Sequence, residues 1–343
     1  MKVFITGGAG FIGCNLAHHH LTLGNHVAIF DNFSRPGSHH NLDWLRAHPA
    51  ATSSLDVQVG DIRDFEALHT SVTEAQPDLI IHLAAQTAVT TSILNPREDF
   101  EINAMGTFYV LESARSQARK PAVFYASTNK VYGALEDVPT TEDANRYRLT
   151  DLPDGVNEIQ SLDFHSPYGC SKGAGDQYMR DYARIFGLRT VVFRQSCVYG
   201  PRQFGVEDQG WVAHFLISAA LNRPITVYGD GKQVRDLLHV QDLISAYDAA
   251  WRRIEITQGQ IFNIGGGSGN TISVWAEFRP WLEELSGAEI TVHYEDTRQG
   301  DQVSFVSDNT RAMEWLGWQP AIHYRLGVRE LWEWINRNLE LFS

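Results

Sequence analysis

The feature of this chain that most constrains its fold is a regular alternation of short β-type segments with longer helical ones. The β-type segments are Val3–Thr6, Val27–Phe30, Val57–Val59, Leu79–Leu83, Ala122–Ala126 and Thr190–Phe193. Segments with helical apolar spacing lie between them, at Ile12–Leu23, Phe65–Ala75 and Phe100–Ala118. This order indicates right-handed βαβ crossovers. It predicts an α/β fold with a doubly wound parallel sheet of the Rossmann type, covered by helices on both faces.

The alternation becomes irregular after Phe193, where loops rich in glycine and proline separate aromatic-rich helices, the last at Leu326–Leu341. We therefore expect a Rossmann domain over residues 1–195, to which residues 236–262 return. A smaller C-terminal α/β lobe for the substrate would comprise residues 196–235 and 263–343. About thirty residues between Gly133 and His165 show little periodicity. A loop of that length is more often functional than idle, and a solvated excursion is the alternative.

Composition narrows the classes of partner. The formal net charge of −13 argues against nucleic acid, because phosphate backbones attract basic proteins. The sequence has no run of about eighteen apolar residues, so we expect no membrane partner. Three scattered cysteines predict neither a disulfide framework nor a zinc site, and they favour a reducing cytoplasm. The adjacent His18, His19 and His20 would point in three directions on a helix, so we predict no metal site.

A glycine-rich turn, TGGAGFIG, follows the first strand at residues 6–13. Gly7 permits a tight turn, Gly10 allows the backbone to approach a pyrophosphate, and Gly13 allows the helix to pack closely on the strand. The N–H groups that open the following helix, at Phe11 and Ile12, would then hold the diphosphate. The turn predicts a dinucleotide cofactor, and a purely structural turn is the alternative.

An acidic residue, Asp31, closes the second strand eighteen residues after Gly13. Its carboxylate can accept hydrogen bonds from the adenosine ribose and would repel a 2′-phosphate, which favours NAD over NADP. Arg35 is the nearby residue that would bind such a phosphate instead. Asp61, after the third strand, is placed to bond the adenine amino group. Small residues at 84–85, after the fourth strand, would let the cofactor approach closely.

Tyr168 and Lys172 lie four residues apart, on one face of an expected helix. A phenol has a reference pKa near 10, so it needs about three pKa units of stabilisation, or ~4 kcal/mol, to act as a base near neutrality. A close ammonium and a nicotinamide cation can supply that stabilisation. Thr128 ends the fifth strand at the carboxyl edge of the sheet, where doubly wound folds bind ligands. Its hydroxyl can hold the same substrate oxygen as Tyr168 during proton transfer.

These motifs together resemble the extended short-chain dehydrogenases/reductases that modify nucleotide-linked sugars. The resemblance covers essentially the whole chain, through GGAGFIG at 7–13, DNFSR at 31–35, GDIRD at 60–64, HLAAQ at 82–86, STNKVYG at 127–133, SPYGCSK at 166–172, RQSCVYGPRQ at 194–203, YGDGKQVRDLLHV at 228–240 and RQGD at 298–301. It implies bound NAD and a catalytic triad of Thr128, Tyr168 and Lys172. With the segments above, it assigns the cofactor site to Gly7, Gly10, Phe11, Ile12, Gly13, Asp31, Asn32, Ser34, Arg35, Asp61, Ile62, Leu83, Ala84, Ala85, Gln86, Asn103, Ser127, Tyr168, Lys172 and Gln195.

The two residues after Thr128 distinguish reactions within the family. Sugar 4,6-dehydratases resemble one another in carrying Asp-Glu there, the acid and base that remove water across C5 and C6. This chain has Asn129-Lys130 instead. An elimination without those carboxylates is hard to explain, so the resemblance does not favour a dehydratase.

The sequence is most similar to the CDP-tyvelose/CDP-paratose 2-epimerases. The similarity rests on STNKVYG at 127–133, NRY at 145–147, RQSC at 194–197 and GVEDQGW at 205–211. Cys197 stands where most 4-epimerases have asparagine. The similarity implies that the enzyme oxidises a CDP-linked hexose at C2, forms a transient 2-keto sugar and returns the hydride to the other face. NAD is then regenerated in each turnover.

The resemblance implies a substrate site in the second half of the chain and just after Thr128. Guanidinium groups can bind phosphate in bidentate fashion, and Arg235 and Arg298 match pyrophosphate- or ribose-binding positions of the family. For each arginine a surface salt bridge is the alternative. The expected substrate-binding residues are Asn129, Lys130, Cys197, Arg202, Gln209, Gly210, Arg235 and Arg298.

Two other functions stay open. One is a UDP-hexose 4-epimerase, which would use the same triad at a different carbon. The other is a non-catalytic NAD-binding redox sensor, although a sensor has no need of an activated phenol. The tryptophans and the apolar face of the C-terminal helix would serve either the core or a homo-oligomer, and we expect a homo-oligomer.

Overall fold

The computed structural model describes residues 1–298 and 300–342, and the chain forms two compact units. The first unit comprises Met1–Thr128, Ser166–Arg194 and Tyr247–Phe262, and the second comprises Asn129–His165, Gln195–Ala246 and Asn263–Ser343. This division differs from the expected domains in two segments and one residue, because residues 129–165, Gln195 and residues 236–246 group with the second unit. The RQGD motif at 298–301 includes Gln299, which lies outside the described residues.

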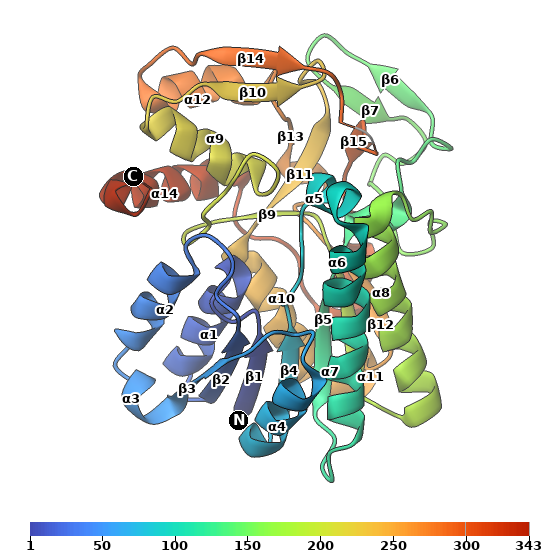
Figure 1. The fold of residues 1–343 in the computed structure, drawn as a ribbon. Coiled ribbons are helices and arrows are strands. Elements are labelled where there is room, and N and C mark those ends of the chain that lie inside the picture. Colours follow the sequence, from blue (N-terminus) through green and yellow to red (C-terminus); the bar gives the residue numbers. More distant parts are fainter. Residues whose placement is uncertain (299, 343) are drawn as a thin grey trace. The chain divides into compact units, whose positions relative to one another are not determined.

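A seven-stranded sheet has the order β12-β8-β5-β4-β1-β2-β3 (Figure 1). β1 pairs in parallel with β2 and β4, β2 pairs in parallel with β3, and β4 with β5. The order steps outward from β1 in both directions, which confirms the predicted doubly wound α/β fold. The strands are β1 (Lys2–Thr6), β2 (His26–Asp31), β3 (Leu55–Val59), β4 (Leu79–His82), β5 (Ala122–Thr128), β8 (Thr190–Gln195) and β12 (Gln260–Ile264).

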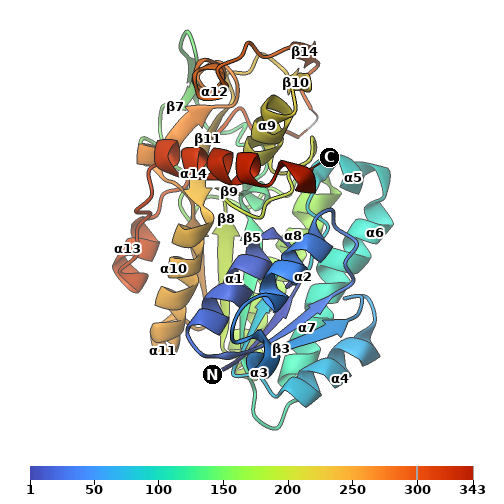
Figure 2. The same ribbon diagram turned by 90° about the vertical axis from the view of Figure 1, so that its left-hand side faces the viewer.

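Helices cover both faces of this sheet. Figures 1 and 2 show α1 (Phe11–Thr22) and α2 (Ser38–Arg46) on one face, and α4 (Phe65–Ala75) and α7 (Gly106–Arg115) on the other. α8 (Ser166–Phe186) packs beside α7 and on β5. One core of the unit joins Ile80 and Val123 of the sheet to Leu68, Leu111 and Met179 of these last three helices. α3 (Ala51–Ser54) and α11 (Ile254–Thr257) are short.

The helix expected at Phe100–Ala118 is interrupted. α6 (Pro96–Phe100) leads into a π-helical turn at Glu101–Met105, and α7 follows that turn. A further short helix, α5 (Val89–Leu94), precedes α6. Both α5 and α6 pack against α8, so this segment is held beside the helix that carries Tyr168 and Lys172.

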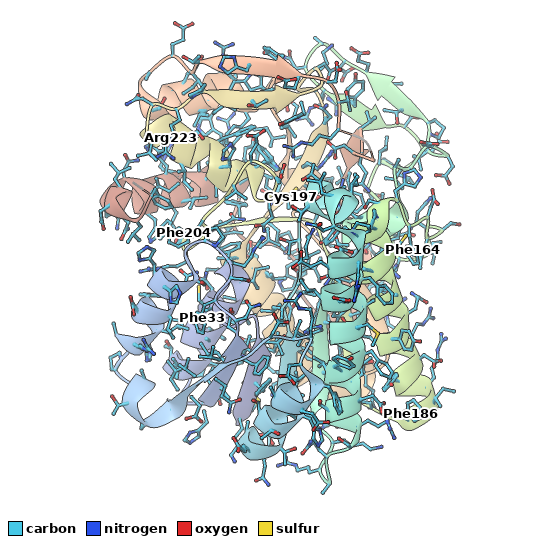
Figure 3. All side chains as sticks on the ribbon, in the orientation of Figure 1. Phe33, Phe164, Phe186, Cys197, Phe204 and Arg223 are labelled. Carbon is cyan, nitrogen blue, oxygen red and sulfur yellow. The ribbon has the colours of Figure 1, made fainter. Side chains whose placement is uncertain are left out.

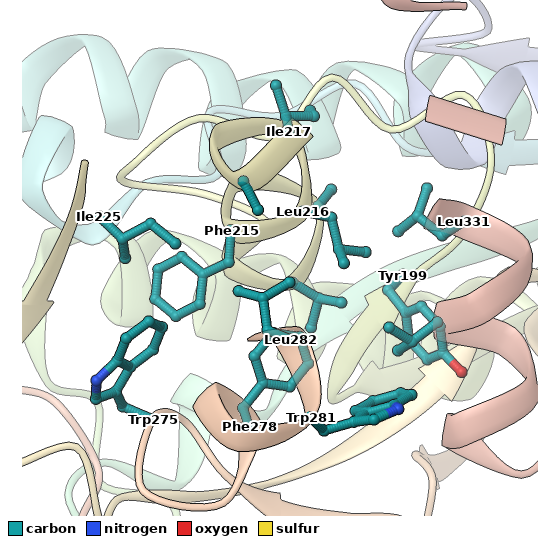
Figure 4. Close-up of a cluster of buried hydrophobic side chains, with 14 of the residues drawn as sticks. Tyr199, Phe215, Leu216, Ile217, Ile225, Trp275, Phe278, Trp281, Leu282 and Leu331 are labelled. Carbon is teal, nitrogen blue, oxygen red and sulfur yellow. The ribbon is translucent and has the colours of Figure 1, made fainter. Parts of the chain in front are cut away.

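The second unit is built around smaller sheets. β10 (Ile225–Tyr228) pairs with β14 (Val292–Glu295), while β11 (Val234–His239) pairs with β9 (Cys197–Tyr199), β13 (Thr271–Ser273) and β15 (Ser304–Phe305). Its helices are α9 (Trp211–Ala220), α12 (Phe278–Ser286), α13 (Thr310–Leu316) and α14 (Tyr324–Arg337), and α10 (Val240–Arg252) runs from this unit into the first. Figure 4 shows its apolar core, where Phe215, Trp275, Phe278 and Trp281 pack together.

The segment between Gly133 and His165 is ordered by its own contacts. It contains a short hairpin of β6 (Thr140–Glu142) and β7 (Tyr147–Leu149). Leu135, Val138 and Val156 form a small core with Tyr132 and Phe305. No helix in the described part of the chain combines the length and the apolar character that a membrane crossing requires.

Candidate active site

The glycine turn between β1 and α1 has the geometry that a phosphate-binding turn needs. Gly7 has φ +69°, and a Cβ there would lie 2.7 Å from the backbone nitrogen of Ala84. A Cβ on Gly13 would lie 2.2 Å from the Gly7 carbonyl oxygen, so the helix could not approach the turn with any larger residue. A Cβ on Gly10 would meet only that oxygen, at 3.2 Å, which leaves room for a ligand. Gly10 gives α1 no side-chain cap, so its first N–H groups can bind an anion.

The side chain of Asp31 is buried at the end of β2 and joins the turn to the next loop. Its carboxylate accepts hydrogen bonds from the backbone N–H of Ala9 (2.9 Å) and of Phe33 (2.8 Å). Burial raises the pKa of this carboxyl, against those two N–H groups. Each oxygen retains a lone pair for a ribose hydroxyl, so the residue fits the predicted NAD contact.

The other residues of this region are interlinked. Asn32 donates to Asp61 (2.9 Å) and accepts from the Ser34 hydroxyl (2.7 Å). Arg63 bonds both oxygens of Asp61 and holds the pKa of that carboxyl well below its usual range. Asp61 is therefore a charged acceptor beside β3. Ile62, also predicted at the cofactor, packs against Gly106 of α7.

Arg35, predicted at the cofactor, contacts the segment after β4. Its guanidinium donates to the Thr87 hydroxyl at 2.6 Å, in the segment after β4. It is near enough to Tyr168 to lower the pKa of that phenol.

The segment after β4 is fixed by Asn103 of the π-helical turn. The Asn103 amide accepts from the backbone N–H of Gln86 and donates to its carbonyl, both at 3.0 Å. The Gln86 side chain bonds the backbone of Ala88. Leu83 continues the ladder from β4 to Thr6, and Ala84 lies against Gly7. Asn103 thus ties the helix to the predicted cofactor segment at residues 83–86.

The first unit brings Thr128, Tyr168 and Lys172 together. All three are buried, and the Thr128 and Tyr168 side chains are hydrogen-bonded. The Lys172 ammonium lies 4.2 Å from the centre of the Tyr125 ring, in cation–π contact. Burial raises the pKa of Tyr168 to about 12, although the Thr128 hydrogen bond opposes this. Burial lowers the pKa of Lys172 to about 7, against the effect of Asp99 and Asp176.

Ser127, predicted at the cofactor, has its side chain turned toward α8. Its hydroxyl donates to Asp176 (2.9 Å), and Arg194 bonds both oxygens of the same carboxylate at 2.9 Å. Asp176 is fully buried, and Arg194 is nearly so. This network joins the ends of β5 and β8 to α8, so it positions the strand end that carries Thr128.

All eight predicted substrate-binding residues belong to the second unit. Lys130 and Arg235 share one carboxylate, that of Asp301, at 3.1 Å and 2.7 Å. Burial opposes ionisation of Asp301, but Arg235 and Lys130 outweigh it and hold the pKa of that carboxyl far below its usual range. Burial raises the pKa of the adjacent Cys197 thiol, which Figure 3 labels. Two cations on one carboxylate leave a net positive charge in this cluster.

The Asn129 amide donates to the Gln302 side chain (3.1 Å), and Gln302 donates to the Gly133 carbonyl (2.7 Å). Gln195, predicted at the cofactor, is buried at the end of β8, in the second unit.

The remaining predicted residues lie in the loops around α9. Arg298 bonds Asp208 (3.1 Å) and stacks over the Tyr228 ring at 3.8 Å. Arg202, with φ +71°, lies over the Trp334 ring at 5.5 Å. Gln209 exchanges backbone hydrogen bonds with Val206, and Gly210, with φ +76°, precedes α9. Arg298 is half-buried, and its guanidinium is held by Asp208 and the Tyr228 ring.

Two residues of the NRY motif at 145–147 hold the segment between Gly133 and His165 in place. Arg146 bonds both oxygens of Glu277 on the second unit, at 2.8 Å and 2.5 Å. The Tyr147 hydroxyl donates to Asp230 (2.6 Å). These contacts give Arg146 and Tyr147 a role in folding the insert, which the sequence did not indicate.

Comparison with known proteins gives the same family over nearly the whole chain. The family described as GDP-mannose 4,6 dehydratase matches residues 4–331. The chain belongs to this family of extended short-chain dehydrogenases/reductases. It is 44% identical over 339 residues to the CDP-paratose 2-epimerase of Salmonella typhi, covering 97% of this chain and 99% of that one. Members of the family are NAD-dependent nucleotide-sugar epimerases and dehydratases, and this chain is an enzyme of that type.

Solved structures of family members have the same fold. The UDP-glucose 4-epimerase of Thermotoga maritima, solved with UDP-glucose, superposes with a TM-score of 0.84 at 28% identity. The match covers 99% of this chain and 100% of that one. The UDP-glucose 4-epimerase of Thermus thermophilus, solved with NAD, gives a TM-score of 0.81 at 28% identity, covering 98% of this chain and 99% of that one.

Two carboxylates near these residues, the buried Asp99 and the partly exposed Asp301, were not predicted. Asp301 holds Lys130 and Arg235, and Asp99 bonds Ser171 beside Lys172. Asp301 follows the matched Arg298 by three residues, which is a usable signal. Asp99 stands four residues before Asn103, on the same helical face, and that spacing could have indicated it.

Proposed function

We propose that this enzyme epimerises a CDP-linked hexose at C2, with NAD regenerated in each turnover. The observation that carries the proposal is the pair Asn129-Lys130, directly after the catalytic Thr128. It supplies an amide and an ammonium where a dehydratase needs an acid and a base. The 44% identity to a CDP-paratose 2-epimerase supports the choice of carbon and of nucleotide.

The first-unit residues account for proton transfer. Thr128 and Tyr168 are hydrogen-bonded to each other, so one substrate hydroxyl can bridge them. Tyr168, as phenolate, takes the proton of the C2 hydroxyl, and the Lys172 ammonium stabilises the phenolate charge. The turn at 7–13 and Asp31 would hold NAD, which would supply the hydride acceptor for the oxidation and the hydride for the reduction. Tyr168 then gives the proton back to the C2 oxygen after the 2-keto sugar has presented its other face.

The second-unit residues account for binding of the anionic nucleotide. Lys130 and Arg235 lie on one carboxylate, and Arg298 lies on Asp208. Their positive charge is placed within a chain of net charge −13, which provides a local site for a diphosphate. Cys197, neutral because burial raises its pKa, offers a small surface where asparagine would offer a hydrogen-bond donor.

The experiment is an incubation with CDP- and UDP-hexoses in heavy water, with the product read by proton NMR. Direct abstraction of the C2 proton is disfavoured because C2 has no adjacent carbonyl. We therefore expect inversion at C2 of a CDP-sugar without deuterium at that carbon, because the same hydride returns.

Deuterium at C2 would contradict hydride return. Inversion at C4 of a UDP-sugar, with C2 unchanged, would establish the second candidate, a UDP-hexose 4-epimerase. The structural similarity to two UDP-glucose 4-epimerases is the observation that favours this second function.

A further inference from the structure

Asp99 is a buried carboxylate that the proposed mechanism does not use. It lies on α6 and is 0% exposed. Its Oδ2 accepts from the Ser171 hydroxyl at 2.5 Å, and its Oδ1 accepts from the Asn103 amide at 3.0 Å. Ser171 directly precedes Lys172, so the carboxylate is joined through one hydrogen bond to the helical turn that carries the ammonium.

The π-helical turn at Glu101–Met105 explains how Asp99 is held there. The Asn103 amide nitrogen, within that turn, lies within hydrogen-bonding distance of Asp99 (3.0 Å), Ser171 (3.1 Å) and the Gln86 carbonyl (3.0 Å), and its two hydrogens are shared among these acceptors. A single π-helical turn inside an α-helix is rare and occurs frequently at functional sites. Here it places one amide against three acceptors, of which Asp99 is the carboxyl group.

The titratable side chains that face Lys172 come from four elements. Asp99 lies on α6, Asp176 on α8 itself, His82 on β4 and the Tyr125 ring on β5. Arg194 offsets the charge of Asp176 through two hydrogen bonds. His82 is neutral, because burial lowers its pKa to about 3. Within residues 1–298 and 300–342, Asp99 forms no ion pair with an arginine or lysine. Burial raises the pKa of its carboxyl, while the Ser171 hydrogen bond, the Lys172 charge and the Asn103 hydrogen bond favour its ionised form.

We propose that Asp99 is a positioning residue whose negative charge sets the pH range in which Tyr168 and Lys172 work as a pair. The proposal rests on the catalytic role proposed above for those two residues. The working pair is a phenolate beside an ammonium. A negative charge near both groups favours the protonated form of each, so it moves both limbs of the pH profile upward.

The test compares Asp99→Asn, which removes the charge and keeps the shape, with Ser171→Ala, which removes the hydrogen bond and keeps the charge. In Asp99→Asn we expect both limbs of the kcat profile to move to lower pH by about one unit, the low end for a close charge. In Ser171→Ala each limb of the profile should move by no more than about a third of the shift expected for Asp99→Asn. Asp99→Glu should return the profile toward that of the parent enzyme.

A second measurement does not depend on turnover. The ultraviolet absorbance of phenolate is titrated in the NAD-bound enzyme, and the titration of Tyr168→Phe in the same background is subtracted. The Tyr168 titration should move to lower pH in Asp99→Asn. If Asp99→Asn does not fold, Asp99→Ser removes the same charge. Unmoved limbs and an unmoved phenolate titration would overturn the proposal, even if kcat falls. Near-normal turnover of Tyr168→Phe would instead overturn the proposed catalytic role, which separates the two failures.

Discussion

At the scale of single residues, Tyr168 must lose its proton in the proposed reaction, although burial raises its pKa to about 12. Tyr168→Phe keeps the ring and removes the proton-transfer group. We expect turnover to fall at least ~100-fold, with NAD binding by calorimetry unchanged. Tyr182→Phe on the same helix is the control, because its hydroxyl bonds Glu112 and should leave turnover within a few-fold. Equal turnover in the two variants would remove Tyr168 from the mechanism.

For Arg235 we expect an effect on binding and not on turnover, because it would hold the diphosphate equally well in the ground state and in the transition state. Arg235→Leu should raise KM for the nucleotide sugar at least ~10-fold while kcat changes little. Arg329→Leu, on the exposed side of α14, is the matched control and should change neither constant. A fall in kcat at unchanged KM would place Arg235 in the chemistry.

Much of the candidate site could be predicted from short motifs. The turn at 7–13, Asp31 and the Tyr168/Lys172 spacing are local in sequence, so a single segment reveals each of them. Asp99 belongs to no such segment, and Asp301 lies in the RQGD motif at 298–301, which does not show what its carboxylate binds. Their importance comes from contacts with Ser171 in one case and with Lys130 and Arg235 in the other, and tertiary contacts of that kind leave little trace in the local pattern.

At the scale of elements, the buried pair of Asp176 and Arg194 fixes β8 and the end of β5 on α8. Arg194→Met removes the guanidinium that bonds both oxygens of Asp176 and leaves that buried carboxylate without its ion-pair partner. We expect the free energy of unfolding in urea to fall by about 3–5 kcal/mol, the usual cost of removing one partner of a buried ion pair. Arg337→Met breaks an exposed pair with Glu333 and should cost less than about 1 kcal/mol. Similar losses in the two variants would mean that the buried pair is not a structural constraint.

The glycine turn makes a prediction about cofactor binding. Gly13→Ala would place a Cβ 2.2 Å from the Gly7 carbonyl, and backbone atoms cannot move as cheaply as a side chain. We expect at least ~10-fold weaker NAD binding by calorimetry and a loss of about 1–3 kcal/mol in stability. Gly269→Ala, where a Cβ would meet nothing within 4 Å, is the control. Unchanged NAD binding in Gly13→Ala would contradict the assigned turn.

The strands of the sheet could be predicted because buried strands appear as continuous apolar runs. The π-helical turn at Glu101–Met105 could not, because its residues have ordinary helical preferences and the extra residue is fixed by the Asn103 contacts. β12 joins the edge of the sheet beside β8, far from it in sequence. The β6–β7 hairpin has strands of three residues, too short for a periodic pattern.

At the scale of the whole molecule, buried histidines set the response to acid. Burial lowers the pKa of His82 to about 3, and of His20 and His239 to about 4, from an ordinary value of 6.5. The folded protein keeps them neutral, while the unfolded chain binds protons below pH 6.5. Their contribution to stability is therefore complete above pH 6.5 and is lost as the pH falls toward the folded values.

Three such groups at about 1.4 kcal/mol per pH unit each give a slope of at most about 4 kcal/mol per unit. We expect the free energy of unfolding in urea to fall from pH 7.5 to pH 5.5. His82→Gln should reduce that slope by about 1.4 kcal/mol per pH unit, the contribution of one proton. His293 is exposed on β14, so His293→Gln should leave the slope unchanged. An unchanged slope in His82→Gln would show that this ring is protonated in the folded state.

One boundary between the two compact units falls between Thr128 and Asn129. The residues proposed to move a proton therefore lie in one unit, and the residue pair proposed to separate epimerase from dehydratase lies in the other. Exchange of segments of the second unit could then change which bond of a sugar reacts while the proposed redox residues stay the same. An engineer who wants a new sugar product has the same partition to use.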